Sequence, residues 1–246
     1  PHIGTNKLPK IIKSIRETII EYGGKLMFNS RVIDINIKNN AVTGVELQDG
    51  TIIEAPKIIL ATGHSARDIF KLLHEKEIEI EAKAFALGIR VEHKQELIDK
   101  IQYKCETRGE YLPPAPYSIV KQVNGRGVYS FCMCPGGRTI CVSNHSDRLV
   151  TNGTALSARG SSVASSGVVV QVRPEDYSPF GDPRTNPLAG FDFLAHWERL
   201  AFEMGGGGFV APAQRVSDFI DGRMGLDPID TSYRMGTKSA NLRDCL

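Results

Sequence analysis

The chain has 246 residues, of which 41% are hydrophobic and 24% are charged, enough for one large folded domain or two small ones. Its 30 Lys and Arg residues nearly balance its 28 Asp and Glu residues and are scattered, which gives no sign of a nucleic-acid surface. No apolar run approaches the ~20 residues that span a bilayer, and five cysteines are too few for a disulfide framework. We therefore expect a cytoplasmic protein that binds neither nucleic acid nor membranes.

The first third of the chain predicts one helix followed by short strands. Residues 8–22 carry apolar side chains at helical spacing, with Pro9 near the start and two glycines after the end. From residue 25 the apolar period changes to two, which is typical of strands. The expected strands are residues 26–28, 31–37, 42–47, 51–53 and 57–61, the three in the middle forming a meander.

A strand-to-helix junction is expected at Gly63, where the last of these strands ends. Ser65 and Asp68 have the S-x-x-D spacing of a helix-capping pair, so we expect them to cap a short helix over residues 65–73.

The rest of the chain predicts mostly strands. Residues 84–92 alternate bulky side chains with a nearly bare face that carries Gly88, Arg90 and Glu92, and this bare face predicts packing against a helix or another flat group. Pro135-Gly136 favours a type II turn. The other expected elements are a helix over 95–102, strands over 117–123, 127–134, 138–143 and 168–172, a loop over 173–190, a helix over 191–204 and an irregular remainder.

One glycine run imitates a nucleotide-binding motif. Residues 206–211 match G-x-G-x-x-A, but they follow a predicted helix, whereas the dinucleotide fingerprint follows a strand and opens a helix. We interpret the match as accidental, and no other segment has the fingerprint. If the protein binds a dinucleotide, the phosphate-binding turn is expected outside these residues.

The order of elements and several exact strings resemble one protein family. The strings are residues 1–5 (PHIGT), 61–68 (ATGHSARD), 88–93 (GIRVEH), 129–137 (YSFCMCPGG) and 211–215 (APAQR). Together they resemble the bacterial FAD-dependent, NAD-utilising dehydrogenases, a family of uncharacterised flavoproteins. The resemblance runs from residue 1 to about residue 240 and is that of a central fragment, without the upstream Gly-rich turn and a downstream flavin-contacting segment.

This resemblance implies which residues lie near a cofactor. The backbone at Val32 and Ile33 is where it places the adenine of FAD. Ala61, Thr62, Gly63 and His64 form the turn that it places beside the flavin, since ligands of α/β sheets bind beyond the carboxyl ends of strands. Arg67, in the first turn of the next helix, is expected either to meet a phosphate or carboxylate or to be an ordinary exposed arginine.

Three other residues are candidates for catalysis. Cys132 and Cys134 are expected on the same face of a strand, either as small buried residues, as a pair facing the flavin or substrate, or, with Cys141 and His145, as metal ligands. We expect no metal and no disulfide between them, because same-face positions are ~7 Å apart along a strand. Arg90 is expected to pair with Glu92 or to anchor a substrate, and His93 to lie at the surface.

The sequence as a whole therefore predicts an α/β protein in three regions. Residues 1–82 are expected to complete a Rossmann-like FAD/NAD(P)-binding domain with a β-meander, residues 83–185 to form a β-rich substrate region, and residues 186–246 to form a helical portion. The expected function is FAD-dependent oxidoreduction of a small molecule, with NAD(P)H as a further cofactor implied by the resemblance and the missing parts of its own chain as partners. The alternatives are a non-catalytic flavin or RNA-associated binding module and a cysteine-based metal site.

Overall fold

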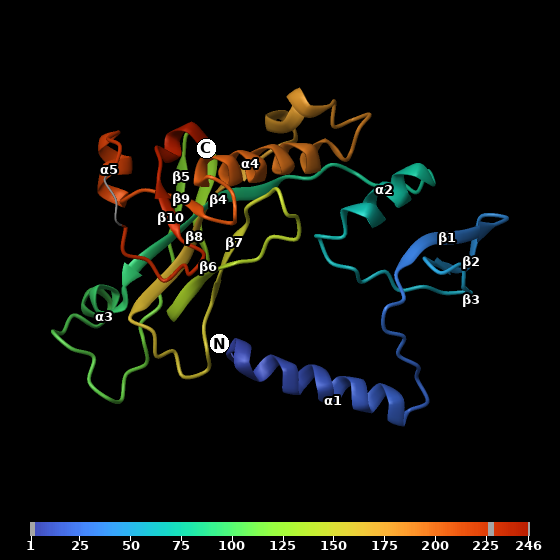
Figure 1. Cartoon of the computed structure of the whole chain (residues 1–246), viewed down its shortest axis with the longest axis horizontal. Helices are drawn as coiled ribbons and strands as arrows, with labels where there is room; N and C mark the ends of the chain where they lie inside the picture. The colour runs from blue at the N-terminus through green and yellow to red at the C-terminus, as the bar shows by residue number, and fades with distance from the viewer. Residues whose placement is uncertain (1–2, 226–228, 246) are drawn as a thin grey trace.

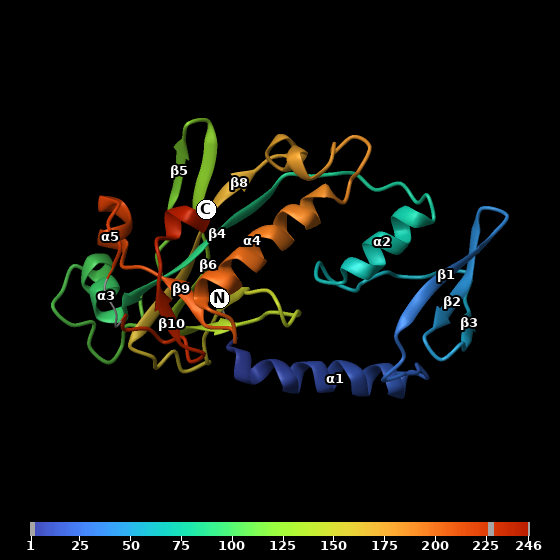
Figure 2. The same cartoon turned by 45° about the horizontal axis from the view of Figure 1, so that its top comes forward.

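The computed structural model describes residues 3–225 and 229–245, a mixed α/β structure whose two larger sheets are antiparallel. An N-terminal part, residues 3–83, lies beside a C-terminal part, residues 84–225 and 229–245 (Figures 1 and 2). No helix in these ranges is long and apolar enough to cross a membrane.

The N-terminal part contains η1 (Thr5–Lys7), α1 (Leu8–Glu21), β1 (Val32–Lys38), β2 (Ala41–Leu47), β3 (Ile52–Glu54) and α2 (Arg67–Glu75). The C-terminal part contains β4 (Phe85–Lys94), α3 (Gln95–Tyr103), β5 (Val120–Val123), β6 (Arg126–Cys141), β7 (Thr151–Thr154), β8 (Val163–Val172), η2 (Pro174–Phe180), α4 (Ala189–Gly205), β9 (Ala211–Ala213), α5 (Val216–Asp221), β10 (Thr237–Ser239) and η3 (Leu242–Cys245).

Helix α1 forms where the apolar spacing predicts it, but its apolar stripe remains at the surface. Proline stands at the second helical position, where its missing N–H costs nothing. Ile12 and Ile15 are both 56% exposed, and no residue of the helix is buried. An amphipathic helix gains most of its stability from packing its apolar face, so this face is suited to further contacts.

The strands expected over 26–28 and 57–61 are wrong, because neither segment is a strand in the structure. The β1-β2-β3 meander is confirmed, and it pairs only within itself among the described strands. A strand needs a neighbour to satisfy its backbone N–H and C=O groups, and these two segments have none here. Their apolar side chains are left in solvent, with Phe28 69% and Ile59 93% exposed.

Helix α2 is confirmed, but the expected cap is wrong. The helix begins one residue before Asp68, Ala66 occupies the N-cap, and no side chain caps it. Asp68 instead accepts a hydrogen bond from Arg31 Nη2 at 2.6 Å, which joins α2 to the segment before β1. The ion pair holds the pKa of the Asp68 carboxyl below its ordinary value.

The C-terminal part is built on the antiparallel sheet β4-β8-β6-β5, with β7 paired to β6. The bare-faced strand β4 is confirmed and pairs with β8 in unbroken register from Phe85↔Val172 to Lys94↔Val163. Beside Arg90 and Glu92 the opposing strand carries Gly167 and the fully buried Ser165. The small residues of β8 thus lie opposite the two charged residues of β4, and Gly88 of β4 lies opposite Val169.

The turn expected at Pro135-Gly136 is wrong, because residues 126–141 form one continuous strand, β6. The register with β8 shifts between Phe131 and Cys134 and again between Cys134 and Gly137. These irregularities bend β6, so its first half pairs with β5 and its second half with β7. Gly136 has φ +57°, and a Cβ there would lie 1.9 Å from Arg159 O. The proline and glycine thus permit a bulge where the sequence suggested a reversal.

Helix α4 supplies the main core of the C-terminal part. Phe193 packs on Val172 and Tyr177, with Phe85 and Trp197 around them. The expected loop over 173–190 contains the short helix η2, whose Tyr177 is 1% exposed. The glycine run that imitates a nucleotide-binding motif follows α4, and Gly206 ends the helix in the left-handed conformation.

The irregular remainder expected after α4 is wrong in part. Strands β9 and β10 form a parallel pair, and α5 lies between them in the sequence. Three-residue strands without strong apolar alternation carry almost no sequence signal, because their pairing is decided by tertiary contacts.

The close approach of β8 to β4 at Gly88 gives a stability test. A Cβ at Gly88 would lie 1.9 Å from Val168 O, so we expect Gly88→Ala to lower the free energy of unfolding by about 1–3 kcal/mol, measured by urea denaturation. The control is Gly127→Ala in β6, where the nearest atom lies 3.7 Å away and a change within ~0.5 kcal/mol is expected. Equal stability of the Gly88 variant and the unchanged chain would show that the strands separate freely here.

Candidate functional site

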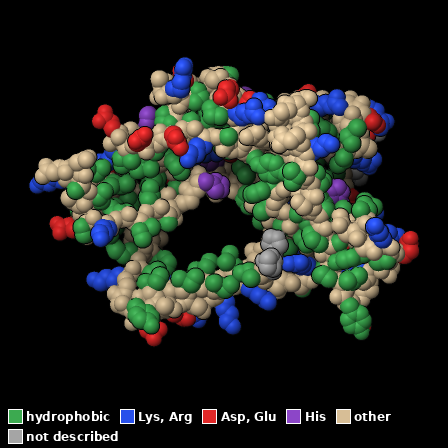
Figure 3. All heavy atoms as spheres, turned by 180° about the vertical axis from the view of Figure 1, so that it is seen from behind, with side chains coloured by type: hydrophobic (Ala, Val, Ile, Leu, Met, Phe, Trp, Pro, Cys, Tyr) green, Lys and Arg blue, Asp and Glu red, His purple; other side chains and the backbone are tan. Residues whose placement is uncertain are grey.

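The two parts of the molecule enclose an opening. In the space-filling view, a gap passes between α1 and the rest of the described chain, and hydrophobic side chains line its α1 side (Figure 3). The start of α1 is tied to the C-terminal part, where Thr5 N donates to Ala155 O at 3.0 Å and Ser157 N donates to Asn6 Oδ1 at 2.8 Å. These hydrogen bonds fix the start of α1, and its apolar stripe faces the gap (Figure 3).

The residues that the resemblance assigns to the cofactor lie around the meander, α2 and the segment between them. Val32, Ala61 and Thr62 line one apolar cavity of about 280 Å³, together with Ile35 and Ile69. Ile33 is 45% exposed on the other face of β1. Gly63 and His64 are exposed in the turn before α2, and Gly63 has φ +77° with open space around its Cα. The structure brings only part of the predicted set together.

Arg67 forms an ion pair with Glu198, which lies 131 positions away in the sequence. Its Nη2 donates to Glu198 Oε1 at 2.8 Å and to Oε2 at 3.0 Å, and the two side chains are 19% and 15% exposed. Its guanidinium also lies over the ring of Phe191, 5.6 Å from the centroid. The contact joins α2 to α4, so Arg67 is neither an ordinary surface arginine nor free of protein partners.

Arg90 makes no ion pair with Glu92, and among residues 3–225 and 229–245 no carboxylate lies within ion-pair distance of it. Its guanidinium donates to Ser165 Oγ at 2.8 Å and to Cys132 O at 3.3 Å. A Cβ on Gly153 would lie 1.9 Å from Arg90 Nη2, so the glycine makes room for this side chain. Arg90 therefore ties β4 to the irregular part of β6 and leaves its Nε without a partner.

Glu92 binds the C-terminal segment instead. Its carboxylate accepts hydrogen bonds from Thr231 Oγ1 at 3.0 Å, Ser232 N at 2.9 Å and Ser232 Oγ at 2.5 Å. Burial by itself raises the pKa of Glu92, but the hydrogen bonds from Ser232 and Thr139 outweigh it and leave the pKa below its ordinary value. The ionised carboxylate thus fixes residues 231–232 against β4.

The two central cysteines are not equivalent, which corrects the expectation that they share one face. Cys132 is exposed and has φ +49°, whereas Cys134 is 5% exposed. The register shift after Phe131 breaks the alternation of the strand between them. Both are free thiols, and Cys134 Sγ donates to Cys132 O at 3.4 Å. Burial raises the pKa of Cys134, although Arg90 opposes this shift.

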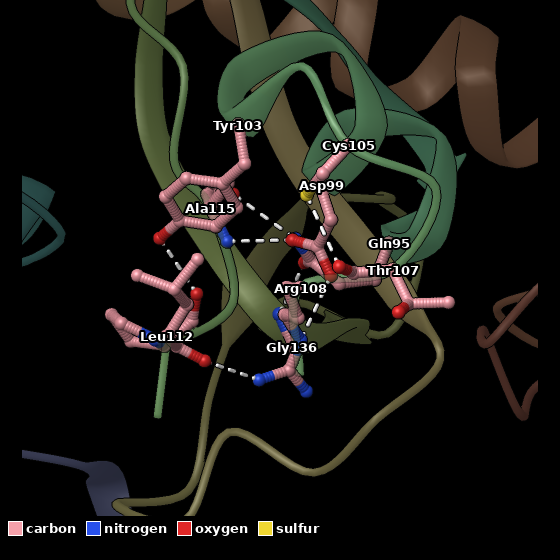
Figure 4. Close-up of polar contacts among 10 residues, drawn as sticks. Gln95, Asp99, Tyr103, Cys105, Thr107, Arg108, Leu112, Ala115 and Gly136 are labelled. Carbon is pink, nitrogen blue, oxygen red and sulfur yellow. Dashed lines mark hydrogen bonds and ion pairs between the residues drawn. The ribbon is translucent and has the colours of Figure 1, made fainter. Parts of the chain in front are cut away.

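A buried polar network fixes the bulge that follows Cys134 (Figure 4). Gly136 N donates to Gln95 Oε1 at 2.7 Å, and Gln95 Nε2 donates to Asp99 Oδ1 at 2.8 Å. Ala115 N donates to the same carboxylate oxygen, and Arg108 Nε lies 2.9 Å from Asp99 Oδ2. Every buried partner drawn is satisfied, so the network anchors β6 to α3.

His93 also differs from its expected surface position. It is half-buried, its Nε2 lies 3.1 Å from Tyr117 Oη, and burial lowers its pKa. No group of three His, Cys, Asp or Glu side chains that could hold a metal ion occurs in the described part of the chain. Cys141 and His145 therefore do not join the two central cysteines as a ligand set there.

Sequence reasoning missed the residues that complete these contacts. Glu198, Arg148 and Ser232 are ordinary surface types in the sequence, and each meets its partner only through the fold. Glu198 stands beside a tryptophan in the middle of the predicted helix, and this is a weak signal in the sequence.

Comparison with known proteins shows the family. A model described as "FAD-dependent protein, C-terminal domain-like" matches residues 84–246, so the chain belongs to this FAD-dependent family. The chain is also 39% identical, over its full length, to an uncharacterized protein of Clostridium beijerinckii. It spans 46% of that relative, so it corresponds to about half of the longer protein.

The two cysteines differ enough in exposure for a labelling test. We expect iodoacetamide to alkylate Cys132 in the native chain at least about tenfold faster than Cys134, because Cys134 is buried and its pKa is raised. Peptide mass spectrometry after timed labelling measures both rates. In Cys132→Ser, Cys134 should stay protected until the chain is unfolded. Equal rates in the native chain would contradict the inequivalent placement.

Proposed function

We propose that the chain is part of a FAD-dependent oxidoreductase that acts on a small-molecule substrate. The observation that carries the proposal is the family match over residues 84–246, which covers the whole C-terminal part. The resemblance of the 61–68 string to the flavin-adjacent turn supports the same reading. NAD(P)H as electron donor belongs to the proposal through that resemblance alone, and a cytoplasmic setting belongs to it through the small number of cysteines.

The described residues fit one side of a flavin site. The exposed turn from Thr62 to His64 follows a segment without regular secondary structure and precedes a helix whose first turn has no side-chain cap. Gly63 offers open space for a flat ring, and the Val32–Ile33 backbone would hold the adenine. When bound, FAD would supply the hydride-transfer chemistry, while these residues orient it and exclude water.

We further propose that the remainder of the longer protein covers the exposed apolar surfaces of the N-terminal part. The stripe of α1, residues 25–28 and residues 57–61 all present large apolar side chains to solvent. The last two segments also have the alternating or apolar sequences that are typical of strands within a sheet, although no described strand pairs with them. A strand added between them would satisfy their backbone groups and bury these side chains.

Two glycines with the same local geometry test the flavin site. Gly63 and Gly50 both have positive φ, +77° and +83°, and a Cβ at either would meet nothing within 4 Å. In the intact longer protein we expect Gly63→Ala to weaken FAD binding at least about tenfold, or ~1.4 kcal/mol, and Gly50→Ala to change it less than twofold. Fluorescence titration of the apoprotein with FAD measures both.

The paired design separates flavin contact from backbone strain, because both substitutions impose the same strain. An intact protein that is colourless as purified and binds no added FAD would overturn the proposed function. Equal effects of the two substitutions would show that the turn at Gly63 does not touch the flavin.

A further inference from the structure

Two arginines share one carboxylate where the N-terminal and C-terminal parts meet. On α4, Glu198 Oε1 accepts a hydrogen bond from Arg67 Nη2 at 2.8 Å. Arg148 Nη1 lies 3.9 Å from Glu198 Oε2. The three side chains are between 15% and 19% exposed. One positive charge is therefore left over in a nearly buried cluster, which is unfavourable unless an anion compensates it.

The surrounding charges do not remove this excess. Asp147 lies 3.8 Å from Arg148 Nε, but it is 56% exposed and is shared with Arg199 at 3.6 Å. With these two added, three arginines face two carboxylates. The first turn of α2, where Arg67 stands, adds the partial positive charge of a helix N-terminus that no side chain caps.

The same cluster holds hydrogen-bond donors without acceptors. Arg67 Nη1 and Arg148 Nε are buried and have no hydrogen-bond partner. The same holds for Nε1 of Trp197, which precedes Glu198 in the chain. Buried donors in native proteins are nearly always satisfied, so each exception calls for a partner such as an ion or a ligand. Arginine guanidinium groups recognise carboxylates and phosphates through such N–H donors.

We propose that Arg67 and Arg148, held apart by Glu198, bind an oxyanion of a small molecule, a carboxylate or a phosphate. The turn of residues 61–64 ends three positions before Arg67 in the chain, so the oxyanion is assigned to the substrate of the flavin enzyme. That assignment rests on the proposed function, whereas the anion site itself does not. Glu198 keeps the two guanidinium groups in place and limits the affinity by competing for them.

The test follows the arginine side chains directly. The ¹⁵N-labelled full chain is titrated with sodium phosphate and, separately, with sodium acetate, at an ionic strength kept constant with sodium chloride. We expect a saturable shift of the Arg148 Nε–Hε resonance, which is assigned by its loss in Arg148→Gln, with at least one of the two anions. The anion that binds distinguishes a phosphate ligand from a carboxylate ligand.

Three variants sharpen the result. Arg148→Gln should weaken anion binding, followed at Arg67, at least tenfold, and Glu198→Gln should strengthen it. Arg31→Gln breaks the exposed ion pair that joins the segment before β1 to Asp68 of α2, whose side chains are 61% and 49% exposed, and should leave the affinity within twofold. If Glu198→Gln fails to fold, the wild-type titration and Arg148→Gln still decide.

The absence of a saturable shift with both anions, or equal affinity in Arg148→Gln, would overturn the anion site. Flavin binding by the intact protein is measured separately and is unaffected by either result. Failure of the anion site and failure of the proposed function are therefore distinguishable.

Discussion

The requirement that backbone N–H and C=O groups find partners governs how far each part of this chain is ordered. In the C-terminal part, β4 and β8 pair over ten residues, and β6 continues the sheet on the other side of β8. In the N-terminal part, residues 25–28 and 57–61 have strand-like sequences but no neighbouring strand in the described chain, and they remain irregular. The same sequence pattern thus leads to opposite outcomes, because a neighbouring strand pairs with it in one part and none of the described strands does so in the other.

This difference explains why the apolar side chains of the unpaired segments are exposed, whereas the aromatic core on the paired sheet is closed. The aromatic cluster around Phe193 encloses Tyr177, which is 1% exposed. Ile59 in the unpaired segment is 93% exposed. The family match begins at residue 84, one position before β4 starts the self-contained sheet. The ion pair of Arg67 with Glu198, whose side chains are 19% and 15% exposed, joins the two parts.

Local patterns in the sequence predicted the elements that depend on local physics. The stripe of α1, the meander and the bare face of β4 were all readable, since each depends on periodicity within one segment. The bend in β6 was not readable, because Pro135-Gly136 suits a turn as well as a bulge, and only pairing with β7 and β8 decides between them. The pair β9 and β10 was missed for the same reason, since its members are separated by α5.

The candidate site shows the same limit. Arg67 and Arg90 were recognised as functional candidates, but the assumed partner of Arg90 was its strand neighbour Glu92. In the structure, Arg90 donates a hydrogen bond to Ser165 and Glu92 accepts one from Ser232. Alternation along a strand predicts which side chains share a face. It cannot show which residues from distant parts of the sequence form hydrogen bonds with them.

Amide hydrogen exchange tests the central proposal, that residues 57–61 pair with a strand from the rest of the longer protein. Peptides covering this segment should exchange rapidly in the 246-residue chain and at least about a hundredfold more slowly in the intact protein. Peptides from β8, residues Val163–Val172, should exchange equally slowly in both, because their partners are already present. Fast exchange of residues 57–61 in the intact protein would contradict the account.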